Sequence, residues 1–476
     1  VRVQGDAFND RLSWLVGGFY SNEDIQQQQN FSLGDDFDPL VGALFGGLAG
    51  PAPLSLFAGG GTPANSSTNN FFTQDSDSWS VFTHNTFDIT DQLSITGGLR
   101  YTDESKDGAF TQPASTNEVC SGLASNVFLG NPLGAPSIPA ALPAPTLFAL
   151  GCFAFTAPAD LASPLGPTFA SLGIPLPTTF AEEFNDDELI YTVKLGYEVT
   201  PDISTYASFT HGFKAGGFNL DSTAAIPVGG VSDPSFESET VDAYEIGVKS
   251  KFWDNRITLN IAGFFEDFSN FQVLEFTGTQ FQTFNVPTAE SLGLEIEATA
   301  QVTDNLFFNG GLTLLDTSYP DDCAGDLTAV NVLALCGNDL TNAPSAVGLL
   351  GATYSGDLGN AYNFFLNGQV RYESDRRTST QAIVLPNGAA IAAAGSVQAA
   401  IDGATLNPLD IQESTFKINV RAGIGSEEQG WGLEAWATNL TDEVTRGVTF
   451  NTPIRGGRSA FVQEPRTYGV TVRKNF

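Results

Sequence analysis

The chain ends with Thr467-Tyr468-Gly469-Val470-Thr471-Val472-Arg473-Lys474-Asn475-Phe476. From Tyr468 onward every second side chain is apolar, interrupted only at Lys474, and the residues between are polar or glycine. A period of two indicates a β-strand with one apolar and one polar face. In a soluble sheet a second protein layer covers the apolar face. In a membrane barrel that face meets lipid, and the polar face lines a wet interior.

The same alternation recurs through the chain and predicts about fifteen strands. Between residues 188 and 199, six apolar side chains occupy alternate positions. Most of these strands have about 10–15 residues, which is longer than the usual five or six and long enough to cross a membrane at a tilt. The predicted strands are residues 1–7, 12–21, 76–88, 93–103, 188–199, 204–213, 237–252, 257–276, 280–302, 307–319, 345–355, 361–373, 414–425, 430–437 and 466–476.

The connections between the predicted strands fall into two kinds that alternate along the chain. Short turns carry Asn, Asp, Gly or Pro, as at Asn9-Asp10, Pro201-Asp202 and Asp254-Asn255. Long connections, such as residues 22–75 and 104–187, are rich in Gly, Pro or Ala. Short turns on one rim and long loops on the other are typical of an outer-membrane barrel. We therefore expect an all-β fold, a transmembrane antiparallel β-barrel with short periplasmic turns and long extracellular loops.

Composition excludes several classes of protein. The chain has 20 Lys and Arg against 54 Asp and Glu, a net charge of −34, so no basic footprint for nucleic acid is expected. No run of about 18 apolar residues predicts a membrane-spanning helix. No nucleophile elbow, phosphate-binding loop or metalloprotease motif accompanies the only histidines, His84 and His211. We therefore expect neither an enzyme nor a cofactor nor a resident metal.

The four cysteines fall into two close pairs, each within one predicted loop. Cys120 pairs with Cys152 and Cys323 with Cys336 in this interpretation. Neither pair has Cys-x-x-Cys spacing or a neighbouring histidine, so a zinc site is not expected. Two disulfides, each closing its own loop, are typical of an oxidising compartment.

Several stretches resemble the barrel half of TonB-dependent outer-membrane receptors. They are residues 205–219, 239–250, 291–298, 437–442 and the closing strand. The family's barrel has 22 strands and a plugged lumen. The resemblance implies that residues 1–476 form a partial barrel domain of about 15 strands, and that the N-terminal plug and the first strands are not in this chain. Phe476 is then the expected C-terminal signal for the outer membrane.

The resemblance also implies a function. The family imports scarce nutrients across the outer membrane of Gram-negative bacteria, with energy from TonB, which contacts the missing plug. On the family's base rate the expected small-molecule ligand is a ferric siderophore, an iron chelate, and the barrel wall is expected to contact outer-membrane lipid. Two other functions stay open, a passive porin-like channel and a structural or adhesive barrel.

Candidate site residues follow from the two faces and the loops. Lys214-Ala215-Gly216-Gly217 is interpreted as a strand end that turns into its loop, with the glycines easing the turn. Trp79, Trp253, Trp431 and Tyr468 are candidates for interfacial aromatic girdles. Charged residues on polar faces are expected to line the lumen wall: Arg100, Lys194, Glu198, Lys249, Glu266, Glu295, Lys417, Arg421 and Arg473. Candidates for ligand contact in the upper loops are Phe31, Phe71, Phe72, His211, Phe218 and Phe450.

Overall fold

The chain folds into one antiparallel sheet of 15 strands in the order β1-β2-β3-β4-β5-β6-β9-β10-β11-β12-β13-β14-β17-β18-β21. The computed structural model describes residues 1–32, 34–36, 54–60, 67–114, 116–137, 148, 151–152, 178–220, 234–276, 281–320, 335–359, 361–380, 393–395, 399, 407–452 and 458–474. The strands are β1 (Arg2–Ala7), β2 (Leu12–Gln29), β3 (Asn70–Asp88), β4 (Leu93–Gln112), β5 (Thr178–Thr200), β6 (Ile203–Lys214), β9 (Glu239–Phe252), β10 (Ile257–Phe276), β11 (Phe281–Thr303), β12 (Leu306–Ser318), β13 (Ala346–Leu358), β14 (Tyr362–Glu373), β17 (Thr415–Ser426), β18 (Trp431–Thr438) and β21 (Thr467–Lys474).

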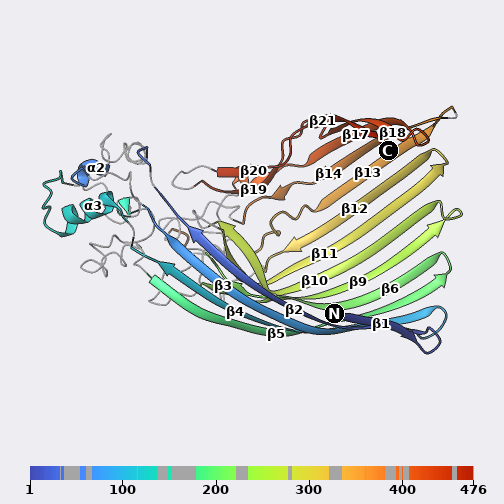
Figure 1. Ribbon diagram of the computed structural model, residues 1–476, viewed down its shortest axis with the longest axis horizontal. Coiled ribbons are helices and arrows are strands. Elements are labelled where there is room, and N and C mark those ends of the chain that lie inside the picture. The colour runs from blue at the N-terminus through green and yellow to red at the C-terminus, as the bar shows by residue number, and fades with distance from the viewer. Residues whose placement is uncertain are drawn as a thin grey trace.

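The sheet curves into a trough whose strands run from a rim of short turns to a rim of long connections (Figure 1). Every neighbouring pair is antiparallel and joined by a hydrogen-bonded ladder, and within the described part of the chain each outer strand, β1 and β21, has a partner on one side only. The predicted all-β architecture, strand number and loop asymmetry are confirmed. We name the two edges the turn rim and the long-loop rim.

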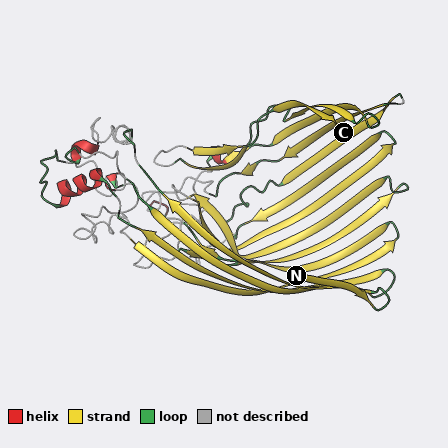
Figure 2. Cartoon of the chain, viewed as in Figure 1, coloured by secondary structure: helices red, strands yellow, loops and turns green. Residues whose placement is uncertain are grey.

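Short elements gather at the long-loop rim, where the few helices are also found (Figure 2). None of the described helices is long and apolar enough to cross a membrane. These elements are the helices α2 (Leu54–Phe57), α3 (Glu118–Phe128) and η1 (Pro408–Asp410), and the two-stranded sheets β7 (Gly217–Phe218) with β8 (Ser235–Phe236), β15 (Arg376–Arg377) with β16 (Ile411–Gln412), and β19 (Arg446–Asn451) with β20 (Arg458–Val462).

Two turns of the turn rim are built from residues in the left-handed conformation. Phe8, Asn9 and Asp10 have φ angles of 54°, 57° and 64°, and the turn at Trp253–Asn255 repeats this pattern. Asn and Asp tolerate this region better than other side chains, which explains the turn chemistry seen in the sequence. The Arg11 guanidinium then donates to the carbonyl of Asp88, with 2.9 Å between Nε and the oxygen, and ties the first turn to the next one.

An apolar band covers one face of the sheet. The register places Leu99 of β4 opposite Tyr191 of β5 and Gly97 opposite Val193, so these side chains share a face. Leu99 is 52% exposed and Val193 is 49% exposed, and no described layer covers them. A row of large, exposed apolar side chains is stable where its surroundings are hydrocarbon, so this is the face that meets lipid.

The band ends sharply toward the long-loop rim. On β4 the residues after Tyr101 on the lipid-side face are Asp103, Ser105 and Asp107, and on β5 the position beside Tyr101 is Leu189, followed by Asp187. The Tyr101 hydroxyl donates to Asp187, with 3.1 Å between Oη and Oδ2. Since carboxylates on a lipid-facing surface are costly in hydrocarbon, this change marks the upper edge of the membrane.

Strands β2 to β5 continue well beyond the ends predicted for them. They contain 18, 19, 20 and 23 residues, so the predicted loop limits 22–75 and 104–187 are wrong at those ends. Above the membrane edge the outward face of a strand meets water instead of lipid, as at Asp103 and Asp107 of β4. The apolar alternation that revealed the strands below therefore disappears, although the backbone ladder goes on.

Disulfides staple the long-loop rim. Cys120, in α3, is bonded to Cys152, which confirms one predicted pair, and Cys336 is also disulfide-bonded. Cys323 and Phe476 lie outside the described residues. No pattern in the sequence predicted helix α3; its N-cap is Asn117, whose side chain accepts a hydrogen bond from the Cys120 amide.

Candidate functional site

All nine residues predicted for the lumen wall lie on the face opposite the lipid-facing one. Lys194 and Lys249, from β5 and β9, both lie over the ring of Tyr206, 4.5 and 5.6 Å from its centroid. The Tyr206 hydroxyl donates to Glu245. Gly247 leaves room for this ring, because a Cβ there would come within 2.5 Å of Tyr206. Two cations of the wall thus lie over one ring, and a carboxylate holds the hydroxyl of that ring.

A second charged group lies near the chain's end. Arg421 of β17 donates to Glu434 of β18, with 2.6 Å between Nε and Oε1. Arg473 of β21 approaches the other oxygen of Glu434 at 4.0 Å. Three strands are therefore linked by charge across the polar face, and the remaining wall positions follow from the register: Arg100, Glu198, Glu266, Glu295 and Lys417.

Two of the predicted ligand-contacting phenylalanines are buried. Phe72 is 0% exposed and stacks on Phe110 at 4.5 Å between centroids. Phe218 is also buried and packs against Phe180 at 6.3 Å. Neighbouring side chains cover both of these rings, so they leave little surface for a ligand in this structure.

Two other candidates lie away from the polar face or at its margin. Phe71 is 44% exposed, but its register with Thr111 puts it on the lipid-side face, above the membrane edge. Phe31 lies just beyond β2, where its carbonyl accepts from the Thr68 amide at 2.9 Å.

His211 also faces away from the polar side. It is paired directly with Tyr191, stacks on that ring at 5.2 Å and shares its lipid-side face. Its Nδ1 lies 2.6 Å from Asp242 Oδ1, and its Nε2 lies 3.7 Å from Glu188 Oε1. Asp242 therefore holds the Nδ1 of this ring at the membrane edge, and no group of metal-binding side chains is found among the residues that the structure describes.

The connection between β6 and β9 crosses toward β2–β5. Lys106 Nζ donates to the Gly216 carbonyl at 2.5 Å, and burial lowers the pKa of this lysine. A Cβ on Gly216 would lie 2.3 Å from the Phe236 carbonyl, so glycine is needed here for close approach and not only for turning. Asn219 and Thr283 exchange two hydrogen bonds of 2.7 Å, which joins this connection to the tip of β10–β11.

A cavity of about 370 Å³ opens between the tip of β10–β11 and the β19–β20 hairpin. Phe450, one of the predicted ligand candidates, lies 4.8 Å from Phe276, 5.8 Å from Phe281 and 5.5 Å from Phe461, measured between ring centroids. Phe461 is 61% exposed, so the ring cluster is open to solvent. The hydroxyl- and amide-bearing residues that line the cavity are Gln272, Tyr319, Thr341, Asn342, Thr378, Ser379, Thr380 and Thr449.

The sequence did not single out Phe276, Phe281 or Phe461. A usable signal was present, because two phenylalanines bracket the short tip at residues 277–280. Their convergence on Phe450, 169 residues further along from Phe281, depends on how the two hairpins fold toward each other.

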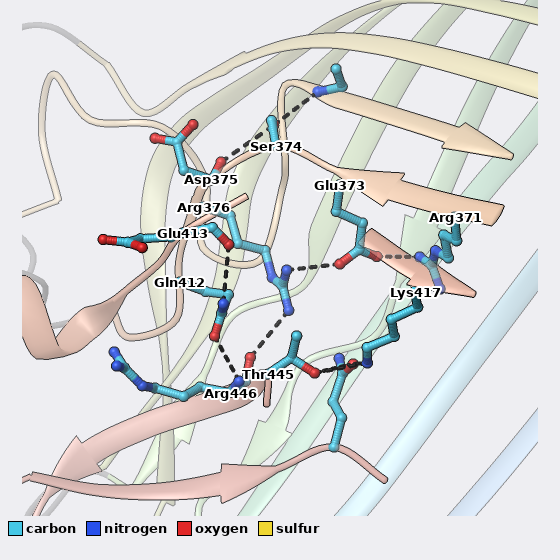
Figure 3. A network of polar contacts seen from close by, with 12 residues as sticks. Arg371, Glu373, Ser374, Asp375, Arg376, Gln412, Glu413, Lys417, Thr445 and Arg446 are labelled. Carbon is cyan, nitrogen blue, oxygen red and sulfur yellow. Dashed lines mark hydrogen bonds and ion pairs between the residues drawn. The ribbon is translucent and has the colours of Figure 1, made fainter. Parts of the chain in front are cut away.

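A polar network holds the β19–β20 side of this cavity in place (Figure 3). Arg376 Nη1 lies 2.9 Å from Glu373 Oε2, and its Nη2 donates to the Arg446 carbonyl at 3.1 Å. The Arg446 amide donates to Gln412 Oε1 at 2.8 Å. Lys417 donates to Thr445 Oγ1 at 2.8 Å. The network joins β14, β15, β16 and β17 to the start of β19.

A buried carboxylate lies at the centre of the same region. Asp410 of η1 is 0% exposed, and its Oδ2 lies 2.5 Å from Arg458 Nη2. Thr449 Oγ1 donates to Asp410 Oδ1 at 2.7 Å, and Thr378 donates to the Asp410 carbonyl at 2.9 Å. Burial raises the pKa of Asp410 above its ordinary value, against the opposing effects of Thr449 and Arg458.

Comparison with known proteins identifies the family. A family model described as "TonB dependent receptor-like, beta-barrel" matches residues 3–440. The chain belongs to this family of TonB-dependent receptors. Receptor barrels of this family lie in the Gram-negative outer membrane, so the long-loop rim of this one is extracellular and the turn rim periplasmic.

Solved siderophore receptors share the barrel's fold. The ferric yersiniabactin uptake receptor FyuA of Yersinia pestis is 15% identical with a TM-score of 0.63, covering 100% of this chain and 53% of that one. The siderophore receptor PiuA of Acinetobacter baumannii is 15% identical with a TM-score of 0.59, covering 99% and 54%. The closed form of the ferric-catecholate import receptor Fiu of Escherichia coli K12 is 14% identical with a TM-score of 0.57, covering 100% and 54%.

Curated sequences match over a shorter stretch. The pesticin receptor of Yersinia pestis is 29% identical over 116 residues, which is 24% of this chain and 16% of that protein. That of Yersinia enterocolitica is 27% identical over 114 residues, again 24% and 16%. The TonB-dependent barrel described here spans about half the length of the solved receptors that it matches.

Proposed function

We propose that the receptor containing this barrel imports a ferric siderophore across the outer membrane, with energy delivered through TonB. The observation that carries the proposal is the family match over residues 3–440. FyuA, PiuA and Fiu, which share the fold, are each described as receptors for siderophores or ferric chelates.

The geometry supports the same function. Exposed apolar side chains suit one face of the sheet to lipid, and paired charges suit the other to a wet interior. At the extracellular end lies a cavity of about 370 Å³, within the range of small-molecule sites. A receptor that binds its ligand before importing it needs a ligand-sized cavity at the extracellular end of its barrel, and this cavity lies there.

Uptake of radioactive iron tests the proposal. The gene is deleted from its host, restored on a plasmid, and supplied with ferric siderophores under iron limitation. We expect uptake that depends on the gene and that disappears when TonB is deleted or the proton gradient is collapsed. Gene-dependent uptake that continues without TonB would mean that the barrel is a passive channel. If deletion of the gene abolished adhesion but not uptake, the barrel would have a structural role.

A further inference from the structure

The aromatic cavity between the two hairpins restricts the chemistry of its occupant. Phe276 and Phe281 come from the tip of β10–β11, and Phe450 and Phe461 come from β19–β20. Offset or tilted ring contacts between about 4.5 and 7 Å are attractive. Each of these four rings makes at least one such contact with another, yet Phe281 and Phe461 remain 37% and 61% exposed. The exposed parts of these rings can therefore contact another aromatic ring.

The cavity carries no charge of its own. Its described lining consists of aromatic, aliphatic, hydroxyl and amide side chains. Burial raises the pKa of Tyr319 to about 12, so its hydroxyl stays neutral. Residues 277–280 and 381–401 contain no charged side chain, and residues 453–457 contain one, Arg455.

The arginines near the cavity that the structure describes are engaged by protein acceptors. Arg377 donates to Asn338 Oδ1 at 2.5 Å, Arg446 donates to the Leu409 carbonyl at 2.9 Å, and Arg458 pairs with Asp410. A polyanionic chelate needs cations that remain available to it. It would also approach a chain with a net charge of −34, whose field repels anions.

We propose that this cavity binds an aromatic or heteroaromatic ring of an iron chelate that has no net negative charge. This proposal rests on the proposed function, the import of iron chelates. The phenylalanines supply the ring contacts, and the hydroxyl and amide side chains, such as Thr380 and Asn342, hydrogen-bond the polar edge of that ring. Phe450 is the central ring of the site, because it contacts the other three.

Calorimetric titration of the purified full-length receptor tests this assignment with three ferric probes. They are a neutral tris(hydroxyphenyl-oxazoline) complex, a tris-catecholate complex with charge −3 and a neutral trihydroxamate without rings. We expect the neutral ring-bearing probe to bind most tightly. Tighter binding of the tris-catecholate or of the ring-free probe would overturn the proposal.

Single substitutions locate the rings that touch the probe. Phe461→Ala and Phe450→Ala are each expected to weaken binding of the ring-bearing probe by roughly 2- to 12-fold, the range for one aromatic pair, and to leave the trihydroxamate unchanged. Phe450→Leu, which fills the space without a ring, should behave like Phe450→Ala. Phe71→Ala, an exposed phenylalanine outside the cavity, is the matched control. Equal losses for all probes would mean that Phe450 only holds the hairpins together.

The uptake assay separates this inference from the proposed function. If the receptor imports no iron chelate, both fail. If it imports one with full efficiency in the Phe450→Ala and Phe461→Ala variants, only the assignment of this cavity is overturned.

Discussion

The two sides of the barrel wall extend beyond the membrane with different structures. On one side strands β2–β5, the tall wall, continue as unbroken ladders of 18 to 23 residues. On the other side β14, β17, β18 and β21, the low wall, have 12, 12, 8 and 8 residues. Above the low wall, the chain continues in two separate two-stranded sheets, β15–β16 and β19–β20. We call these two sheets the cap.

Different interactions hold the tall wall and the cap. Inside the tall wall, Phe72, Phe110 and Phe180 form a buried aromatic cluster. The cap depends on charge pairs and hydroxyl groups, with Asp410 buried beside Arg458. Apolar packing is insensitive to pH, whereas a buried carboxylate is not. One of the two hairpins that form the cavity therefore belongs to the pH-sensitive side of the barrel.

The largest expected effect is on the tall wall. Phe72→Ala should remove a fully buried ring and cost about 3–5 kcal/mol of local stability, because the void left behind adds to the loss of apolar burial. Hydrogen exchange of the amides in residues 70–75 and 105–112 measures the loss. Phe71→Ala, its exposed neighbour, should change exchange by less than about 0.5 kcal/mol. Equal effects of the two would show that the wall does not rely on this cluster.

Removal of the disulfide should come next. The double variant Cys120→Ser with Cys152→Ser frees a loop closed over a separation of 32 residues, at a cost of about 2–4 kcal/mol to the local structure around α3. Limited proteolysis of intact cells should then cut near residues 118–137. The ladder between β4 and β5 is expected to keep its exchange protection, and its loss would mean that the tall wall depends on the loop it carries.

In the cap, Asp410→Asn should cost about 1–3 kcal/mol, because the amide nitrogen that replaces one carboxylate oxygen would face the Arg458 guanidinium or the Thr449 hydroxyl and lack an acceptor. Exchange of β19 and β20 should accelerate while that of β3 and β4 stays constant. The variant Thr380→Ala, which removes a cavity-lining hydroxyl and keeps the Asp410 carboxylate, is the control. Faster exchange in both walls would contradict the distinction between them.

The pH dependence of the cap tests the same distinction. Burial raises the folded-state pKa of Asp410 above its unfolded value, so between these two values the folded cap binds more protons than the unfolded one. Its stability should therefore be highest at acidic pH and fall as pH rises from the unfolded-state pKa through the folded-state pKa. Exchange of β19–β20 measured from about pH 4 upward, with Asp410→Asn as reference, checks this. A wild-type profile parallel to that of the variant would contradict it.

The smallest effect is expected at the periplasmic turns. Arg256 Nη2 lies 3.4 Å from Asp304 Oδ1, and both side chains are largely exposed. Arg256→Gln should cost less than about 1 kcal/mol, since exposed pairs are screened by water and salt. A larger change in thermal unfolding would show that the turn rim contributes more than its exposure suggests.

Much of the fold could be predicted because lipid imposes a pattern on the strands. Alternation in stretches such as 188–199 identified all 15 strands in the correct order. The same pattern put Lys194, Arg421 and the other seven wall residues on the polar face. It failed above the membrane edge, as at Asp103 and Asp107, because the outward face meets water there and no longer has to be apolar.

The candidate site was only partly predictable. Phe450 was expected to contact ligand and lines the cavity, whereas Phe72 and Phe218 are packed inside the wall and His211 faces outward. The sequence around an aromatic residue in a loop looks the same whether its side chain is exposed or buried. Only the folded hairpins distinguish these cases.

Local sequence was enough to define the strands, their lipid-facing and polar faces and the turns that join them, because each depends on neighbours within a few positions. Folding in three dimensions was needed to bring Phe276, Phe281, Phe450 and Phe461 together, to bury Asp410 beside Arg458, and to place Lys106 against Gly216. These contacts join segments far apart in sequence, and their formation depends on the curvature of the sheet that carries them.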